Sequence, residues 1–83
     1  MKEIYEKFEK NNLTSGQYDF SQRWLGQSAS YYSATLSQNR DISLKALVNL
    51  LRRVQLELQG DLADDKRVML SETESQLRKK IFI

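Results

Sequence analysis

Basic side chains concentrated in the middle of the chain are the residues most able to do chemistry. Residues 20–56 contain one acid, Asp41, and have a net charge of +4, although the whole 83-residue chain has a net charge of only +2. The bases of this stretch are Arg23, Arg40, Lys45, Arg52 and Arg53. Such a local excess of positive charge is what binding to a polyanion requires. A solvated basic face without a partner fits the charge equally well.

The acidic residues do not form a pattern for catalysis or metal binding. The chain has no His and no Cys, which excludes an imidazole base, a thiolate nucleophile, a disulfide and the usual zinc sites. Its clustered carboxylates lack the glycine-interrupted spacing of a calcium loop and indicate a solvated acidic surface. These carboxylates are Asp61, Asp64, Asp65, Glu72 and Glu74. We therefore expect no enzyme, no metal and no cofactor.

The composition favours a single all-α domain. The sequence has no Pro and only three Gly, which argues against a turn-rich β fold. No apolar run approaches the length of about 18 residues that a membrane span needs, and no signal peptide is expected. We therefore expect a cytoplasmic protein.

The first two helices are predicted from apolar spacing. Residues 2–11 place Ile4, Tyr5 and Phe8 on one face, and Leu13 is expected to return to the core. The second helix could be capped by Thr14, with Gln17 three residues later, or by Asp19, with Gln22 three residues later. Both spacings suit a capping box, so both alternatives remain.

A turn at Gly26 is predicted to separate the second helix from a third. Phe20, Trp24 and Leu25 share a helical face, and the glycine that follows suits the positive φ at which helices commonly end. The third helix is expected from Ser28 to Ser37, with the Ser28 hydroxyl as its cap and Tyr32 and Leu36 directed inward. Its outer face then carries only small side chains, Ser30, Ser33, Ala34 and Ser37.

Two more helices complete the prediction. Ser43 is expected to cap a fourth helix with a core stripe of Leu44, Leu47, Val48, Leu51, Val54 and Leu58. Leu50 and Leu56 fall off this stripe. Ser71 and Glu74 have the spacing of a capping box that opens the last helix, whose apolar residues include Leu77, Ile81 and Phe82.

The central segment resembles the helix-turn-helix of the phage-repressor (lambda repressor and Cro) family. The residues that carry the resemblance are Leu25-Gly26, Ser28, Tyr32-Ser33, the loop Gln38-Asn39-Arg40-Asp41, Ser43-Leu44 and Leu47. They cover about half of the chain. One position departs from the pattern: the small residue that the family carries four positions before the turn glycine is Gln22 here, and Ser21 lies five positions before. Either the turn carries one extra residue or Gly26 is not the turn glycine.

The resemblance implies a five-helix, lambda-repressor-like domain whose third helix enters the major groove of double-stranded DNA. The residues expected to face the bases are Ser28, Ala29, Ser30, Ser33, Ala34 and Ser37. The residues expected to contact the DNA backbone are Gln17, Arg23, Tyr31, Gln38, Asn39, Arg40 and Lys45. A structural salt bridge from Arg40 to Asp41 or to another acid is the competing interpretation.

The resemblance further implies a transcriptional regulator, a repressor, that acts as a homodimer. We expect one domain over residues 1–83, with a headpiece (1–59) and a C-terminal helical extension (60–83). The apolar surfaces left off the core stripe are expected to meet, within one chain or between two, and we favour two-fold pairing. The expected interface residues are Leu50, Leu56, Leu77, Ile81 and Phe82. The alternative function is a protein-interaction module or antitoxin-like partner with the same fold.

Overall fold

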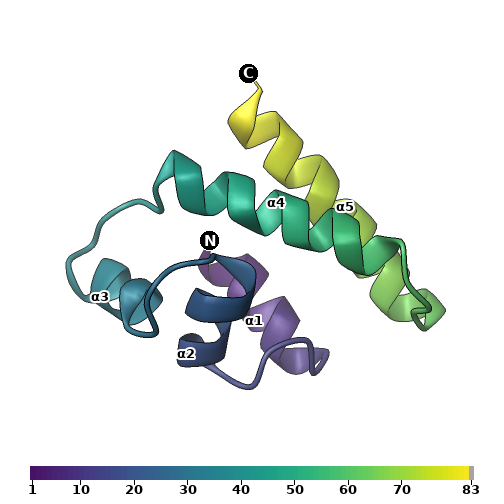
Figure 1. Cartoon of the computed structure of the whole chain (residues 1–83), viewed down its shortest axis with the longest axis horizontal. Coiled ribbons are helices and arrows are strands. Elements are labelled where there is room, and N and C mark those ends of the chain that lie inside the picture. Colours follow the sequence, from purple (N-terminus) through teal and green to yellow (C-terminus); the bar gives the residue numbers. More distant parts are fainter. Residues whose placement is uncertain (83) are drawn as a thin grey trace.

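The computed structural model describes residues 1–82, which contain helices and no strand (Figure 1). The helices are α1 (Lys2–Lys10), α2 (Gln17–Asp19) with its π-helical continuation η1 (Phe20–Trp24), α3 (Tyr31–Ser37), α4 (Leu44–Leu58) and α5 (Asp64–Ile81). The all-α fold class is therefore confirmed. Within the same residues, no helix combines the length and apolar character needed to cross a membrane.

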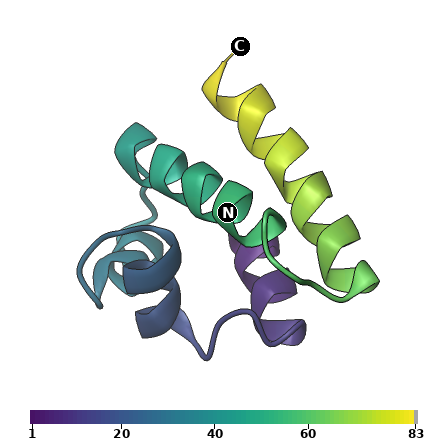
Figure 2. The same cartoon turned by 45° about the vertical axis from the view of Figure 1, so that its right-hand side comes forward.

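Helix α4 lies between two parts of the molecule. In Figures 1 and 2, α5 runs beside α4, and the segment from α2 to α3 lies on its other side. The pair α4 and α5 makes the most extensive contact between helices. Helix α4 is therefore covered on two sides, and this decides which of its residues are buried.

An aromatic cluster joins α1, η1 and α3. Its members, Tyr5, Phe8, Phe20, Trp24 and Tyr32, are all buried. Their ring centroids lie 4.6–5.7 Å apart, mostly in edge-to-face pairs. Each such pair contributes about 0.5–1.5 kcal/mol beyond the area that it buries. The predicted inward faces of the first two helices are confirmed.

Helix α3 begins at Tyr31, three residues later than predicted, and Ser28 does not cap it. Residues 28–30 instead form a turn in which the Tyr31 backbone N–H donates to the Ser28 carbonyl (3.0 Å). The prediction that Leu36 is inward is wrong, because its side chain is 44% exposed. In this short helix Thr35 takes the buried position instead, and its hydroxyl donates to the Tyr31 carbonyl (2.7 Å).

Helix α4 is capped as predicted but is buried over a wider face. The Ala46 backbone N–H donates to the Ser43 hydroxyl at 3.2 Å. The prediction for Leu44 is wrong, because this residue is exposed in the first turn. Leu50 was expected off the core stripe, yet it is fully buried, because the two-sided cover of α4 widens its apolar face beyond one stripe. Leu56 is exposed, which agrees with its position off the stripe.

Helix α5 begins at Asp64, so the prediction of a start at Ser71 is wrong. The carboxylates of Asp64 and Asp65 lie in its first turn, where the helix dipole favours them. The Arg67 guanidinium donates to the carbonyls of Leu58 (2.8 Å) and Gly60 (2.9 Å) and ties α5 to the end of α4. The residues before Ser71 are helical as well, and Leu70 among them is fully buried in the core.

The five residues predicted for a dimer interface divide into three groups. Leu50 and Leu77 are fully buried within one chain, so their assignment to a surface between chains is wrong. Ile81 packs partly buried against the same core. Leu56 and Phe82 remain exposed. The apolar surfaces of α4 and α5 thus meet within one chain, and the C-terminal segment shares its core with the headpiece.

Replacement of Leu77 by Ala should lower the free energy of unfolding by about 2–5 kcal/mol, because it leaves a cavity between α5 and the core. Urea denaturation followed by circular dichroism measures the loss. Leu56→Ala is the matched control, since its side chain is exposed, and it should change stability by about 0.5 kcal/mol or less. Equal effects of the two substitutions would contradict the intrachain packing of α5.

Candidate nucleic-acid interface

The turn that leads into α3 contains one more residue than an ordinary helix end. The Leu25 N–H donates to the Phe20 carbonyl (3.0 Å), and the Gln27 N–H donates to the Ser21 carbonyl (2.9 Å). Both bonds span one residue more than their counterparts at the end of an α-helix. The extra residue is therefore accommodated in η1. Gln22 is consequently exposed, and Ser21 takes the inward position.

Ser21 fixes the position of α3. Its fully buried hydroxyl accepts a hydrogen bond from the Tyr32 N–H (2.9 Å) and donates to the Gln17 carbonyl (2.9 Å). The first N–H groups of a helix have no partner within it, so this contact satisfies one of them inside the core. The signal in the sequence is a small hydroxyl residue between Phe20 and Trp24, five positions before Gly26.

Gly26 is the turn glycine, as predicted. Its φ is +64°, in the left-handed region. The Asn49 side-chain amide donates to the Leu25 carbonyl at 3.0 Å, and a Cβ atom on Gly26 would lie 2.8 Å from that amide nitrogen. The turn therefore docks closely on α4.

The residues predicted to face the bases form a surface of small groups. Ala34 and Ser37 are exposed on α3, and Ser28 and Ser30 are exposed in the turn before it. Ser33 is half-buried, with its hydroxyl bonded to the Ser30 carbonyl (3.1 Å). Ala29 is also half-buried. Three of the six residues thus precede α3.

The backbone at the end of α3 holds the predicted phosphate-binding loop. Asn39 adopts a left-handed φ of +51°. Its N–H donates to the Leu36 carbonyl (3.1 Å), and the Arg40 N–H donates to the Thr35 carbonyl (2.9 Å). This pair of bonds is a Schellman motif, with Asn where glycine is commonest. The start of the loop is therefore anchored to the helix.

The Arg40 side chain is available to a ligand. It is exposed, and within the described part of the chain its guanidinium donates only to the Gln38 side-chain oxygen (3.1 Å). Among residues 1–82 it forms no ion pair, so the competing salt bridge to Asp41 is not found. Lys45, in the first turn of α4, is exposed as well.

Tyr31 closes the loop from its other side. Its hydroxyl donates to the Ser43 hydroxyl (3.2 Å) and accepts from the Ser43 N–H (3.0 Å). The first residue of α3 is thus joined to the cap of α4. The hydroxyl predicted to reach a phosphate is already engaged within the protein.

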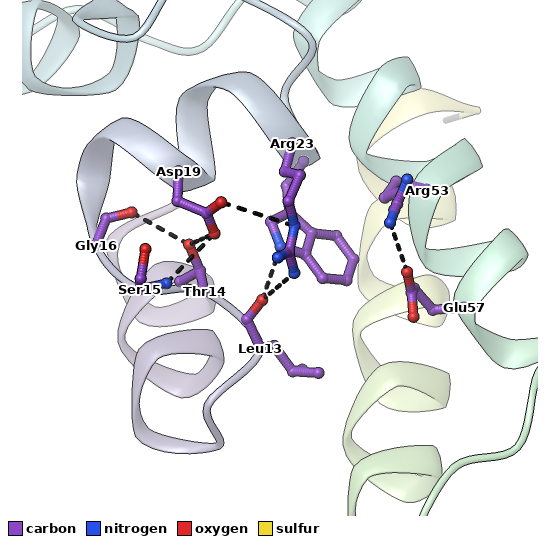
Figure 3. A network of polar contacts seen from close by, with 9 residues as sticks. Leu13, Thr14, Ser15, Gly16, Asp19, Arg23, Arg53 and Glu57 are labelled. Atoms are coloured by element: carbon purple, nitrogen blue, oxygen red, sulfur yellow. Dashed lines mark hydrogen bonds and ion pairs between the residues drawn. The ribbon is translucent and has the colours of Figure 1, made fainter.

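Arg23, also predicted to contact the DNA backbone, belongs to a structural network (Figure 3). Its guanidinium donates to the Leu13 carbonyl (2.7 Å), which also accepts from the Trp24 indole N–H (3.1 Å). It lies 3.7 Å from the Asp19 carboxylate, which accepts from the Thr14 hydroxyl (2.7 Å). Neither predicted capping box forms, and these side chains instead tie the linker after α1 to η1.

Gln17 lies half-buried at the start of α2. Four of the predicted backbone-contacting residues are exposed around the end of α3 and the start of α4, namely Gln38, Asn39, Arg40 and Lys45. Tyr32 is the buried aromatic residue of α3. The pKa of its phenol is raised by burial and, to a smaller extent, by Tyr5 and Glu6. The Tyr32 phenol is therefore neutral.

Among residues 1–82, no cluster of side chains suited to a metal ion is found.

A family model matches residues 1–81, nearly the whole chain. The chain belongs to DUF6626, a family of unknown function. No curated protein and no solved structure is significantly similar to it.

Replacement of Gly26 by Ala should destabilise the fold by about 1–2 kcal/mol through the left-handed φ alone, with a further loss as Asn49 is displaced. Thermal and urea denaturation measure the change. Gly60→Ala is the control, because the nearest atom to its added Cβ is a backbone oxygen at an ordinary 3.7 Å. If Gly26→Ala were as harmless as Gly60→Ala, the turn would not have the conformation described.

Proposed function

We propose that the protein is a sequence-specific, double-stranded DNA-binding transcriptional regulator, a repressor, that acts as a homodimer in the cytoplasm. The observation that carries the proposal is the exposed Arg40, which forms no ion pair with residues 1–82 and lies in an anchored loop that directly follows α3 and its small-residue face. Helix α3 is the element that would enter the major groove. The resemblance to the phage-repressor family adds support on the same residues.

The surface of α3 suggests how such a protein would read DNA. Ala34 and Ser37 are too short for the bidentate base contacts that Arg, Gln and Asn make. They permit a close approach of the helix instead, with apolar contact to thymine methyl groups. Much of the specificity would then come from water and from DNA shape.

The backbone grip would come from the loop after α3 and the first turn of α4. Arg40 and Lys45 supply positive charge, and the side chains of Gln38 and Asn39 supply neutral donors. Arg23 and Tyr31 would act indirectly, since their polar groups hold the protein together.

Arg40→Ala should weaken binding to operator and random duplex DNA alike, because a phosphate contact carries no sequence information. The slope of log affinity against log salt should become shallower by about one unit. Fluorescence anisotropy over a salt series measures both effects. Lys10→Ala removes the same charge from the far end of α1 and should change neither; unchanged binding by Arg40→Ala would remove this residue from the interface.

Ala34→Glu should abolish DNA binding without unfolding the protein, because a carboxylate on the exposed face of α3 would meet phosphates. Stability should change by about 0.5 kcal/mol or less at this surface site. The experiment pairs a DNA-binding titration with a melting curve. Ala63→Glu, the same substitution at an exposed site before α5, should bind DNA normally. Retained DNA binding by Ala34→Glu would show that α3 does not face the duplex.

A protein-interaction module, including an antitoxin-like partner, is the second candidate. One observation favours it: Leu36 (44% exposed) and Leu44 (62% exposed) present apolar side chains on either side of the Arg40 loop. A pull-down that recovers a specific protein, together with no binding to any duplex DNA, would support this candidate over the first.

A further inference from the structure

A groove lies between the start of α1 and the last turns of α5, away from the Arg40 loop. Its volume is about 360 Å³, and it is lined by Met1, Glu3, Ile4, Gln76, Lys79 and Lys80. Ile4 is nearly inaccessible and forms an apolar floor, whereas the two lysines are exposed on the α5 side. An apolar cavity of about 150 Å³ already holds benzene, so this groove has room for an aromatic ring.

An exposed aromatic side chain lies at the same end of the molecule. Phe82 directly follows α5, three residues after Lys79, and its side chain is 73% exposed. It is the most exposed of the large apolar residues among residues 1–82. Because it remains in solvent, it does not fill the groove beside its own helix.

We propose that Phe82 of one copy inserts into the groove between α1 and α5 of a second copy, and reciprocally, so that two chains pair through the C-terminal turns of α5. In a two-fold dimer, each copy must supply both the side chain that inserts and the groove that receives it, on the same surface. Phe82 and the groove meet this requirement, since both belong to the end of α5. A lysine ammonium close to the inserted ring would add a cation–π contact.

The charges around the groove are self-complementary under the same rotation. Its α1 side carries Glu3, and its α5 side carries Lys79 and Lys80. When the two-fold axis runs along the groove, the second copy brings its acidic side toward the basic side of the first. A groove with an acidic side and a basic side is therefore better matched by a second copy of this chain than by a partner that is uniformly acidic or uniformly basic. This inference rests on the proposed function, in which the protein acts as a homodimer, and it adds the surface through which the two copies would pair.

The test is sedimentation equilibrium of the full chain at micromolar concentrations, without DNA. The wild-type protein should be in a monomer–dimer equilibrium, and Phe82→Ala should raise the dissociation constant by about tenfold or more, as loss of a buried aromatic anchor does. Tyr18→Ala, which removes another exposed aromatic ring (67% exposed) on α2, should leave the equilibrium unchanged. Circular dichroism of each variant verifies that it is folded.

A charge exchange tests the orientation of the two copies. Glu3→Lys and Lys79→Glu should each weaken the dimer, and the double variant should regain much of the loss. A monomeric wild-type chain, a dimer indifferent to Phe82→Ala, or a dimer weakened equally by Tyr18→Ala would overturn the proposal. Because no DNA is present, failure here is distinct from failure of the DNA-binding function, which the Arg40 and Ala34 variants test.

Discussion

The hydrogen bond between the Ser21 hydroxyl and the Tyr32 N–H is the contact on which the candidate surface depends. The first turn of α3 is packed against the aromatic cluster, and a buried N–H without a partner costs about 1–3 kcal/mol. The hydroxyl of Ser21 removes that cost and fixes α3 to η1 at a single register. Its own donor is satisfied by the Gln17 carbonyl, so the serine can be fully buried.

This constraint also explains the π-helical geometry of η1. If the α-helix continued regularly up to Gly26, the inward position would fall four residues before the glycine, at Gln22. In the structure Gln22 is exposed, and Ser21 is the inward residue. The long amide of Gln22 would not fit between η1 and α3 as the small serine does. One widened turn avoids this, and the Leu25 and Gln27 N–H groups still find carbonyl partners in η1. The widened turn therefore moves the inward position by one residue, from Gln22 to Ser21, and α3 still follows directly after the turn at Gly26.

The sequence predicted the local features well, because they depend on near neighbours. The inward face of α1, the left-handed glycine after Leu25 and the Ser43 cap all follow from spacing or from the needs of a helix end. The errors concern residues whose environment is set by distant parts of the chain. Leu50 is buried because α5 covers a second side of α4, and periodicity within α4 carries no information about that cover.

The same limit affected the start of α5 and the candidate site. The spacing of Ser71 and Glu74 is a valid local signal, but burial of Leu70 outweighs it and extends the helix to Asp64. At the site, the exposure of Arg40 follows from its place in a polar loop. The engagement of Arg23 with the Leu13 carbonyl spans ten residues, which no local pattern announces.

The burial of Leu50 and Leu77 has a consequence for the motions of the chain. Helix α4 shares one hydrophobic cluster with both its neighbours, so its central amides should exchange with solvent only when the whole domain opens. The chain then behaves as one cooperative unit, without a separable C-terminal part. Any ligand that binds only the folded form, at either end of the molecule, slows exchange throughout this unit by mass action.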